Sequence, residues 1–519
     1  MEDTEHREEW KKSALSEIRQ LESKGTWTEV PLSEATSRVL PGTWVFRKKR
    51  RPDGEIKKFK SRYCCRGDLE EGVFDTYAPV VAFSTVRLFL IAALKMGWKT
   101  QSIDFSNAFV QAYLDKPVWI HLPRGFHSSL PGKSCLRLIK SLYGLSVAPR
   151  LWYQLVLKAL KEMGFTASSI DPCLFFKANI FLILYVDDVG IAFSHEKFLE
   201  ELIEGFKSRG LELTREGTFA EFLGIQYTDN KNGTVTLSQE GLIKKILTAA
   251  DMSSCNPQWT PANKEALGID PDGEPMQESW NYRSIVGMLL YLSTNTRPDI
   301  SFAVSQVARF SHSPKQSHAM AVKKILRYLK ATANRGTDVN IDDEEFKLDC
   351  YVDADFAGLY GRDPAESSTS VKSRTGYIIK LAGCPLLWKS QLQTSIALST
   401  GESEYSALSS AMRALLPIRE QLLELLRALS ISKKLGLVNS TIRSIAHEDN
   451  SSALTLATSQ RITSRTRHYA VKWHFFWSHV KNGNVEVVKV STVDQCADYL
   501  TKGLVREVFE RCRRLSQGW

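Results

Sequence analysis

Two adjacent carboxylates, Asp187 and Asp188, lie between two short apolar runs that are rich in Val, Ile, Leu and Phe. Each run predicts a buried strand, which places the two aspartates at the tight turn of a hairpin. Two anions side by side in apolar surroundings are costly unless a cation neutralises them. A divalent metal ion fits that need, because Mg²⁺ is typically held by one or two carboxylates together with substrate phosphates. The dipeptide alone fits a solvated surface turn equally well, since aspartate favours turns.

A third carboxylate, Asp104, ends the apolar run 100–105 upstream of this hairpin. On neighbouring strands of one sheet, the three carboxylates could hold two divalent ions roughly 3.5–4 Å apart. Such a pair of ions activates a 3′-hydroxyl and stabilises the leaving pyrophosphate in nucleotidyl transfer. Each of these elements is weak by itself, but in this order, with the basic hairpin upstream, they favour a nucleotidyl-transfer site over a surface turn.

A strongly basic stretch precedes these acids. Between Arg47 and Arg66 the chain carries ten basic residues and two acidic ones, a local net charge of +8. Asp53-Gly54 separates two alternating segments here, which predicts a β-hairpin. Because aromatic residues alternate with the basic ones, the hairpin would present a flat cationic surface that suits a phosphate backbone. A solvated charged face is the alternative.

Length and composition set broad limits. The 519 residues, of which 43% are hydrophobic, predict roughly three domains with sizeable cores. A net charge of +10 favours a polyanionic partner, although many basic proteins bind no nucleic acid. Nine cysteines without a C-x-x-C pair predict reduced thiols in an intracellular protein. The polar start predicts no signal peptide, and no apolar run reaches the ~20 residues that span a bilayer, so no membrane partner is expected.

Hydrophobic periodicity predicts the elements that position these residues. Helices are predicted over 8–24, 85–96, 149–163, 282–293 and 317–332, and strands over 100–105, 347–352 and 376–381. A long helical stretch runs from 401 to about 429, and Pro417 should kink or split it. The polar stretch 256–277 is the best candidate for an internal linker, and a second boundary lies near 334–345. The chain beyond it predicts a separate α/β domain of roughly 170 residues.

This C-terminal region holds a second set of acids. They are Asp353 at the end of a strand, Glu404 at the start of the long helix, Asp449 after an apolar strand and Asp498 on the last helix. Each acid alone is more often a helix cap or a surface charge. If the four converge, a metal ion is the expected reason. The neighbours Asp355 and Glu402 should point elsewhere, because of strand alternation and helical rotation.

Four segments resemble the motifs of Ty1/copia-type retrotransposon reverse transcriptases. They are KSLYGLSVAPRLWY (140–153), YVDD (185–188), EFLGI (221–225) and TRPDI (296–300). The resemblance covers almost the whole chain and implies an α+β fold, in which a right-hand polymerase (fingers, palm, thumb/connection) is followed by an α/β ribonuclease H-like domain. The implied segments are 1–40 for an N-terminal amphipathic helix and lead-in, 41–255 for fingers and palm, 256–335 for thumb/connection helices and 346–519 for the ribonuclease H-like domain.

By this resemblance, Asp104, Asp187 and Asp188 form the catalytic, metal-binding triad of the polymerase. Phe109 falls where reverse transcriptases place an aromatic residue that excludes a ribose 2′-hydroxyl. Plain core packing is the alternative role for Phe109.

Four further positions match residues that contact the nucleotide in the family. Tyr143 and Gly144 fall where the family lines the nucleotide pocket and the template. Lys60 and Arg62 resemble the fingers residues that reach the incoming triphosphate, with general phosphate attraction as the alternative. The segment 61–66 departs from the family, which usually has aliphatic residues around a lysine there.

The C-terminal acids resemble those of a ribonuclease H domain of the same retroelement class. The matching catalytic and metal-binding positions are Asp353, Glu404, Asp449 and Asp498. By that likeness, two Mg²⁺ ions per active site, or Mn²⁺ in their place, activate water for attack on the RNA strand of an RNA–DNA hybrid. Two positions depart from the family pattern, because Lys489 stands where a His is common and Ala470 where an Asp is common.

A basic, histidine-containing stretch lies between the last two of these acids. Arg465, Arg467 and His468 match a basic motif of the family. His468, His474 and His479 fit a packed helix with a basic face better than a metal site, because aromatic residues are interleaved and no cysteine lies nearby.

The sequence thus predicts an RNA-directed and DNA-directed DNA polymerase with ribonuclease H activity. Its expected partners are an RNA template, a DNA primer, an RNA–DNA hybrid and dNTPs, with the protease and integrase of a Gag-Pol polyprotein encoded elsewhere. The expected location is a cytoplasmic particle, the nucleus or both. A non-catalytic nucleic-acid-binding relic is the alternative, although all seven acidic positions are present. A metal-dependent hydrolase without polymerase activity fails to explain Phe109, Tyr143 and Gly144 together.

Overall fold

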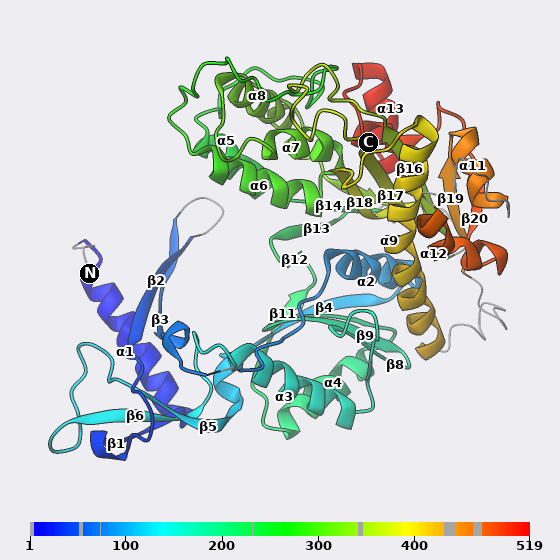
Figure 1. Ribbon diagram of the computed structural model, residues 1–519. Coiled ribbons are helices and arrows are strands. Elements are labelled where there is room, and N and C mark those ends of the chain that lie inside the picture. Colours follow the sequence, from blue (N-terminus) through cyan, green and yellow to red (C-terminus); the bar gives the residue numbers. More distant parts are fainter. Residues whose placement is uncertain are drawn as a thin grey trace. The chain divides into compact units, whose positions relative to one another are not determined.

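The computed structural model describes residues 5–50, 55–72, 74–230, 233–340, 346–429, 442–459 and 470–519. Its internal contacts divide the chain into two compact units (Figure 1). The first unit comprises Met1–Val81 and Lys99–Thr218, and the second unit comprises Ala82–Trp98 and Phe219–Trp519. Each unit mixes helices and strands, which confirms the predicted α+β composition. The four-segment division stays a prediction.

The first unit is built on three antiparallel sheets. Their strand orders are β1-β6-β5, β2-β3 and β11-β4-β10-β9-β8-β7. The strands are β1 (Trp27–Pro31), β2 (Gly42–Arg50), β3 (Ile56–Cys65), β4 (Lys99–Phe105), β5 (Tyr113–Ile120), β6 (Ser134–Lys140), β7 (Thr166–Ala167), β8 (Leu174–Lys177), β9 (Ile180–Tyr185), β10 (Asp188–Phe193) and β11 (Leu213–Thr218). The helices are α1 (Arg7–Ser23), η1 (Leu32–Glu34), η2 (Gly67–Leu69), η3 (Ala108–Gln111), α3 (Ala148–Glu162) and α4 (Glu196–Ser208).

Helix α1 agrees with the predicted helix 8–24, and it covers the open edge of strand β3. The hydroxyl of Ser13 donates to the carbonyl of Phe59 at 3.1 Å and accepts the amide of Ser61 at 2.9 Å. The indole of Trp10 packs edge-on against Phe59, with ring centroids 4.8 Å apart. The helix thereby pairs main-chain groups that an edge strand would otherwise expose.

The six-stranded sheet carries the predicted acidic hairpin, and two helices pack on it. Strand β4 lies between β10 and β11, and β10 pairs with β9, all antiparallel. One buried cluster joins Ile103 of β4, Ile191 of β10, Trp152 of α3 and Leu199 of α4. Helix α3 confirms the prediction for 149–163, with its proline in the first turn. This packing fixes the strands from which the acids project.

The second unit contains a four-stranded and a five-stranded sheet. Their orders are β12-β13-β14-β15 and β18-β17-β16-β19-β20. The strands are β12 (Glu221–Phe222), β13 (Ile225–Asp229), β14 (Val235–Ser238), β15 (Thr337–Val339), β16 (Leu348–Asp355), β17 (Arg374–Leu381), β18 (Cys384–Leu392), β19 (Ser444–Glu448) and β20 (Glu486–Lys489). The helices are α2 (Phe83–Lys95), α5 (Glu240–Ala249), α6 (Tyr282–Asn295), η4 (Pro298–Ile300), α7 (Ser301–Ala308), α8 (Gln316–Ala331), α9 (Thr400–Ala428), α11 (Ser451–Thr458), α12 (Ala470–Lys481), η6 (Cys496–Leu500) and α13 (Arg506–Gln517).

Strand β16 is the centre of the five-stranded sheet. It pairs antiparallel with β17 and parallel with β19, while β17–β18 is antiparallel and β19–β20 parallel. The long helix α9 runs through Pro417 without a break, so the predicted split is wrong. Leu415 before the proline and Leu422 after it are fully buried. Burial on both sides offsets the roughly 3 kcal/mol that a proline costs inside a helix.

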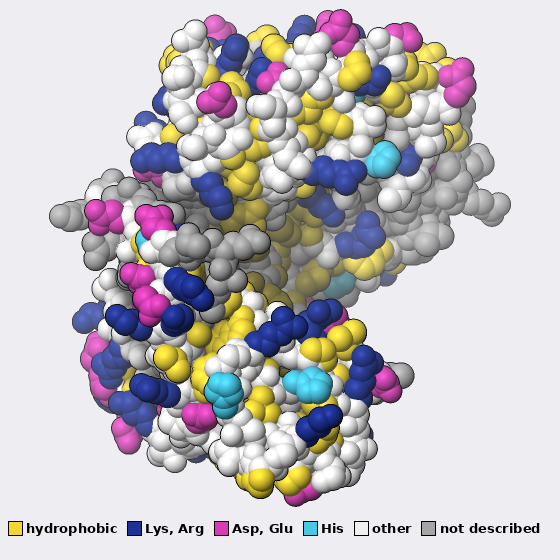
Figure 2. Space-filling model, turned by 90° about the vertical axis from the view of Figure 1, so that its left-hand side faces the viewer, with side chains coloured by type: hydrophobic (Ala, Val, Ile, Leu, Met, Phe, Trp, Pro, Cys, Tyr) yellow, Lys and Arg dark blue, Asp and Glu magenta, His cyan; other side chains and the backbone are white. Residues whose placement is uncertain are grey.

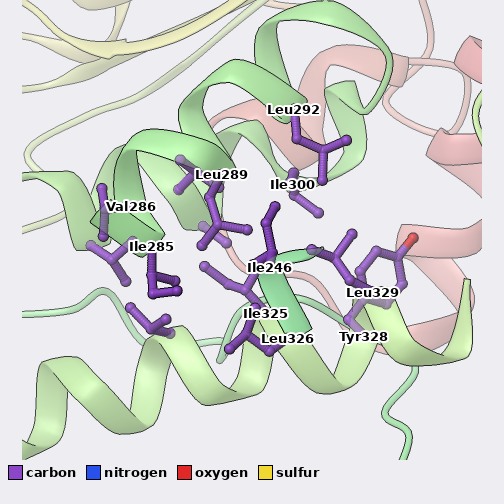
Figure 3. Packing of buried hydrophobic residues seen from close by; sticks show 14 of the residues in the cluster. Ile246, Ile285, Val286, Leu289, Leu292, Ile300, Ile325, Leu326, Tyr328 and Leu329 are labelled. Atoms are coloured by element: carbon purple, nitrogen blue, oxygen red, sulfur yellow. The ribbon is translucent and has the colours of Figure 1, made fainter. Parts of the chain in front are cut away.

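Helices α5, α6 and α8 pack together around one apolar core. Figure 3 shows Ile246 of α5, Leu289 of α6 and Leu326 of α8 pointing toward one another. The TRPDI segment follows α6 and carries a fully buried ion pair, in which Arg297 Nη2 lies 2.7 Å from Asp299 Oδ2. These helices confirm the predictions for 282–293 and 317–332.

The segment 256–277, predicted as an internal linker, is irregular but fixed in place. The carbonyl of Leu267 accepts from Arg309 at 3.0 Å, and that of Gly273 accepts from Lys315 at 2.9 Å. Both sides of the segment lie in the second unit. It is therefore a surface connection within one unit and not a tether between units. The other predicted boundary contains residues 341–345, which lie outside the described part of the chain.

Helix α2 confirms the predicted buried helix 85–96, and it is held by the second unit. Arg87 is almost completely buried there and donates to the carbonyls of Leu386 at 2.6 Å and Asn295 at 2.9 Å. Its guanidinium lies 4.3 Å from the ring centroid of Trp388. Burial lowers the pKa of Arg87 to about 9. The helix thus belongs to the second unit, although β4, which follows it directly, belongs to the first.

Within the described ranges, no helix combines the length and hydropathy needed to cross a bilayer.

Candidate active sites

The acidic turn of the first unit is a two-residue hairpin. Strand β9 ends at Tyr185 and β10 begins at Asp188, so Val186 and Asp187 form the turn. Val186 has a φ of +57°, a left-handed conformation that β-branched residues rarely adopt. Two hydrogen bonds hold it there: Trp152 Nε1 donates to the carbonyl of Val186 at 2.6 Å, and the amide of Phe105 donates to that of Asp187 at 2.9 Å. The predicted turn is confirmed.

Asp188 stands directly opposite Asp104 across the β10–β4 pair. Both carboxyls are half-buried. Burial and then the charges of Asp187 and Asp104 raise the pKa of Asp188 to about 6. Burial, followed by the charge of Asp187, also raises the pKa of Asp104. The three acids therefore repel one another in a poorly solvated place, which is where a divalent cation stabilises carboxylates.

A fourth acid, Glu216, faces this group, and the sequence analysis missed it. Its charge raises the pKa of both Asp104 and Asp188, although burial contributes most to each. The pairing of β11 with β4 shifts register between Arg215 and Gly217, so Glu216 is the extra residue of a β-bulge. Bulges commonly re-aim one side chain next to a functional site. No alternation pattern could have revealed it, because the bulge breaks the alternation.

The basic hairpin β2–β3 sorts its residues onto two faces. Directly paired residues share a face, and Val45 faces Arg62, Arg47 faces Lys60 and Lys49 faces Lys58. One face is therefore cationic, and it is called the cationic face below. The opposite face carries Trp44 and Phe46 with Tyr63 and Phe59 and packs on Trp10. The predicted Asp53-Gly54 turn lies outside the described residues.

Tyr143 links the cationic face to the turn after β4. The Arg62 guanidinium lies over the Tyr143 ring, 4.7 Å from its centroid. The Tyr143 ring is 5.4 Å from that of Phe109, and burial raises the pKa of Tyr143 to about 12. Phe109 is itself half-buried, at the margin of two core clusters. Its position is compatible with a steric gate and with core packing, so both hypotheses stand.

Gly144 permits the close approach of two segments. Its φ is +91°, and a Cβ there would lie 2.0 Å from the carbonyl oxygen of Cys65. The amide of Cys65 donates to the carbonyl of Tyr143 at 2.7 Å, which seals this contact. A glycine is therefore required for the end of β3 to meet the segment before α3.

The charge of the chain is not gathered into one patch on the face drawn in Figure 2. There, Lys and Arg side chains alternate with acidic, apolar and other groups. The cationic face of β2–β3 is thus a local concentration of charge that follows from strand pairing.

Three of the four C-terminal acids converge in the second unit. Asp353 lies within β16, Glu404 in the first turns of α9, and Asp449 directly after β19. One ligand oxygen of each lies within 4.8 Å of the others, and among the described residues this is the only such group of three or more acidic, His or Cys side chains. The aspartates of the first unit are neighbours but do not reach this closeness.

Asp498 lies on η6. The prediction that it lies on the last helix, α13, is therefore wrong. The side chain of Gln495 explains the short turn. It donates to the carbonyl of Val352 at 2.7 Å and accepts the amide of Ala497 at 3.3 Å. This fixes the turn against β16 and brings Asp498 beside Asp353, whose charge raises the pKa of Asp498, after burial, to about 6.

Burial makes this acid group a favourable place for a cation. Burial and then the charge of Asp353 raise the pKa of Glu404 to about 10. Glu448, missed by the sequence analysis, is fully buried beside Asp449, and burial raises its pKa to about 8. Among the described residues, Glu404 Oε2 and Glu448 Oε2 have no hydrogen-bond partner. Buried carboxylate oxygens without partners are costly, and a divalent cation would satisfy them.

The two neighbouring acids, Glu402 and Asp355, lie outside this group, as predicted. Glu402 accepts the amide of Leu398 at 2.9 Å, while Ser399 Oγ accepts the amide of Glu402 at 3.2 Å. This reciprocal pair caps the N-terminus of α9. Asp355 also lies outside the converging group.

The sequence analysis did not predict that Thr501 and Lys502, which follow the last acid, contact this group. Lys502 Nζ lies 3.0 Å from Asp498 Oδ1 and 3.8 Å from Asp353 Oδ2. The hydroxyl of Thr501 donates to Asp353 Oδ2. The i,i+4 spacing of Asp498 and Lys502 could have indicated the first of these pairs.

The histidine-containing stretch is described only in part. Arg465, Arg467 and His468 lie outside the described residues, as does the side chain of His474. Helix α12 confirms that a helix occupies 470–481, and His479 lies in its last turn.

Comparison with known proteins relates most of the chain to retroelement proteins. The family model described as "Reverse transcriptase (RNA-dependent DNA polymerase)" matches residues 24–264. The Retrovirus-related Pol polyprotein from transposon RE1 of Arabidopsis thaliana is 32% identical over 511 residues, which cover 97% of this chain and 33% of the relative. That from transposon TNT 1-94 of Nicotiana tabacum is 31% identical over 519 residues, covering 97% and 37%. The chain thus spans about a third of the length of these relatives.

Among solved structures, a foamy viral protease-reverse transcriptase in complex with double-stranded DNA is similar at 13% identity with a TM-score of 0.49. The match covers 93% of this chain and 70% of that chain.

Proposed function

Because this chain belongs to the reverse transcriptase family of Ty1/copia-type retrotransposon Pol polyproteins, we propose that its first unit is an RNA-directed and DNA-directed DNA polymerase. The observation that carries the proposal is the pairing of Asp188 with Asp104 beside Asp187 at the hairpin turn. The raised pKa values of Asp104 and Asp188, whose carboxyls are half-buried, fit a site for divalent cations. A primer, a template and dNTPs are the proposed partners.

In this proposal, the chain contributes position and charge. Asp104, Asp187 and Asp188 would hold Mg²⁺ or Mn²⁺, which supplies the positive charge that activates the primer 3′-hydroxyl and neutralises the phosphates. Lys60 and Arg62, on the cationic face, would attract and orient the triphosphate. Tyr143 and Phe109 would shape the adjoining pocket, and Gly144 would keep its wall close to β3.

We further propose that the second unit contains a ribonuclease H-like domain over 346–519. The convergence of Asp353, Glu404 and Asp449, with Asp498 adjacent, supports a metal site that cleaves the RNA strand of an RNA–DNA hybrid. The buried oxygen of Glu404 without a partner fits the ligand set. The sheet order around β16 gives these acids a rigid base. The segments 1–40, 41–255 and 256–335 would serve as N-terminal lead-in, fingers and palm, and thumb/connection.

One preparation of the full chain tests both activities. Primer extension on an RNA template and cleavage of a labelled RNA–DNA hybrid are measured in Mg²⁺, and hybrid binding is measured alongside. We expect both activities. Hybrid binding without either activity would instead support the alternative of a non-catalytic nucleic-acid-binding relic.

A further inference from the structure

The acid group of the second unit includes one positively charged side chain, that of Lys502. Asp353, Glu404 and Asp449 form one side, where ligand oxygens lie within 4.8 Å of one another. On the other side, the Lys502 ammonium lies 3.0 Å from Asp498 Oδ1 and 3.8 Å from Asp353 Oδ2. Asp353 is therefore shared between an all-acid side and a side that a lysine neutralises.

Contacts hold the backbone around Lys502 in place, while its side chain is partly exposed and can change its conformation. The amides of Thr501 and Lys502 both donate to the carbonyl of Asp498 at 3.2 Å, and the hydroxyl of Thr501 donates to the Asp353 carboxylate. At the next residue, Gly503, a Cβ would lie 1.8 Å from the carbonyl oxygen of Asn263. The Lys502 side chain remains 41% exposed, so the ammonium can leave the carboxylates on a stem whose base does not move.

A divalent ion cannot occupy the position between Asp353 and Asp498 while the Lys502 ammonium lies there, because like charges repel strongly when poorly solvated. Four ionised carboxylates with one divalent ion and one ammonium leave a single negative charge. A second divalent ion would leave a single positive charge, if the displaced ammonium stays nearby and is counted. A phosphodiester carries one negative charge, so it could balance that state and also give the displaced ammonium a partner.

We propose that the Lys502 ammonium occupies the second cation position of this site, so that the protein without nucleic acid binds one divalent ion there. That ion is held by Asp353, Glu404 and Asp449. The second position, between Asp353 and Asp498, opens when a nucleic-acid phosphate draws Lys502 away. Lys502 is thus a positioning residue that couples metal loading to substrate. The inference rests on the proposed function, because it takes these acids as metal ligands.

Calorimetric titration of the full chain with Mn²⁺, without nucleic acid, tests this. The ions of this site are those lost on Asp353→Asn, which separates them from ions bound in the first unit. We expect Asp353→Asn to remove one Mn²⁺ per chain from the native background and two from a Lys502→Met background, because Asp353 borders both cation positions. Lys502→Arg should keep the native number, because the guanidinium retains the charge. Lys389→Met, an exposed lysine on β18 of the same sheet, should also keep it.

A loss of two ions from the native background, or no extra ion in Lys502→Met, would overturn the inference. If Asp353→Asn removes no ion from any background, the proposed metal site itself fails, which is a different pattern. Thermal unfolding of each variant checks that the fold is kept. Should Lys502→Met unfold, Lys502→Gln provides the same removal of charge with a polar side chain.

Discussion

Trp152 Nε1 donates a 2.6 Å hydrogen bond to the carbonyl oxygen of Val186, the left-handed residue of the acidic turn. The indole belongs to α3 and lies in the core cluster beneath β4 and β10. A core side chain thus holds the strained backbone that presents Asp187. The acidic turn is consequently coupled to the packing of α3.

Trp152→Phe should reduce primer extension beyond what its loss of unfolding free energy explains. The ring still packs, but the Val186 carbonyl loses its donor, which costs about 1–2 kcal/mol of unfolding free energy. Tyr153→Phe is a matched control, because it removes a 3.0 Å hydrogen bond from the same helix to Pro172, away from the turn. Equal losses of extension in both variants, measured beside denaturant unfolding, would contradict a special role for the Trp152 contact.

The two proposed sites should be separable by substitution. Asp187→Asn should reduce extension on the order of a hundredfold or more and leave hybrid cleavage measurable, because the acid groups lie in different units. Glu404→Gln should do the reverse. Glu402→Gln is the control for Glu404, since its carboxylate caps α9. If either variant loses both activities while it remains folded, the assignment of two separate sites is wrong.

Asp188 makes the stability of the metal-free protein depend on pH. Its pKa is raised to about 6, so folding is favoured while the carboxyl is protonated, and this contribution is lost as the pH rises through that value. In a chelator, Asp188→Asn should therefore raise the melting temperature at about pH 8 more than at about pH 4. Asp115→Asn removes a carboxylate paired with Arg150 at 3.1 Å and should give no such gain. A pH-independent effect of Asp188→Asn would contradict the burial argument.

Phe109→Val distinguishes the two hypotheses for Phe109. If the ring excludes a 2′-hydroxyl, ribonucleotide incorporation should rise roughly ten- to hundredfold relative to dNTP incorporation. Phe105→Leu is the control, because Phe105 is fully buried at the end of β4 and should lose stability without a change in sugar preference. An unchanged preference in Phe109→Val would assign Phe109 to core packing.

Metal binding in the second unit should release protons. Burial and Asp353 keep the pKa of Glu404 at about 10, so this acid must lose its proton to bind a cation near pH 7. Mn²⁺ affinity should therefore increase with pH, and its binding heat should depend on the ionisation heat of the buffer. In Glu404→Gln both dependences should weaken. A buffer-independent heat in the native chain would contradict the protonated state.

Local patterns predicted the elements well where one helix face or one strand alternation decides the structure. Helix α1 is an example, since Trp10, Ala14, Ile18 and Leu21 are all buried as their spacing requires. The hairpin around Asp187 was predictable for the same reason, because both of its strands are apolar throughout.

The missed features depend on contacts between distant segments. Glu216 is re-aimed by a bulge, and Asp498 lies on a short turn that Gln495 fixes to β16. Lys502 acquires its partner Asp353 only when η6 packs on the sheet. The convergence of the C-terminal acids was expected from family resemblance, since no spacing along the chain could establish it.

The contacts of Arg87 with the second unit have a consequence for recombination between related genes. A gene segment that ended at residue 264, where the family match stops, would still encode α2 but not Leu386, Asn295 or Trp388. Its arginine and the apolar side chains of that helix would then lose the groups that bury them in the second unit, and the helix would expose an apolar surface. Recombination between elements would therefore conserve both halves as a matched pair, and exchange of the polymerase half alone would be selected against.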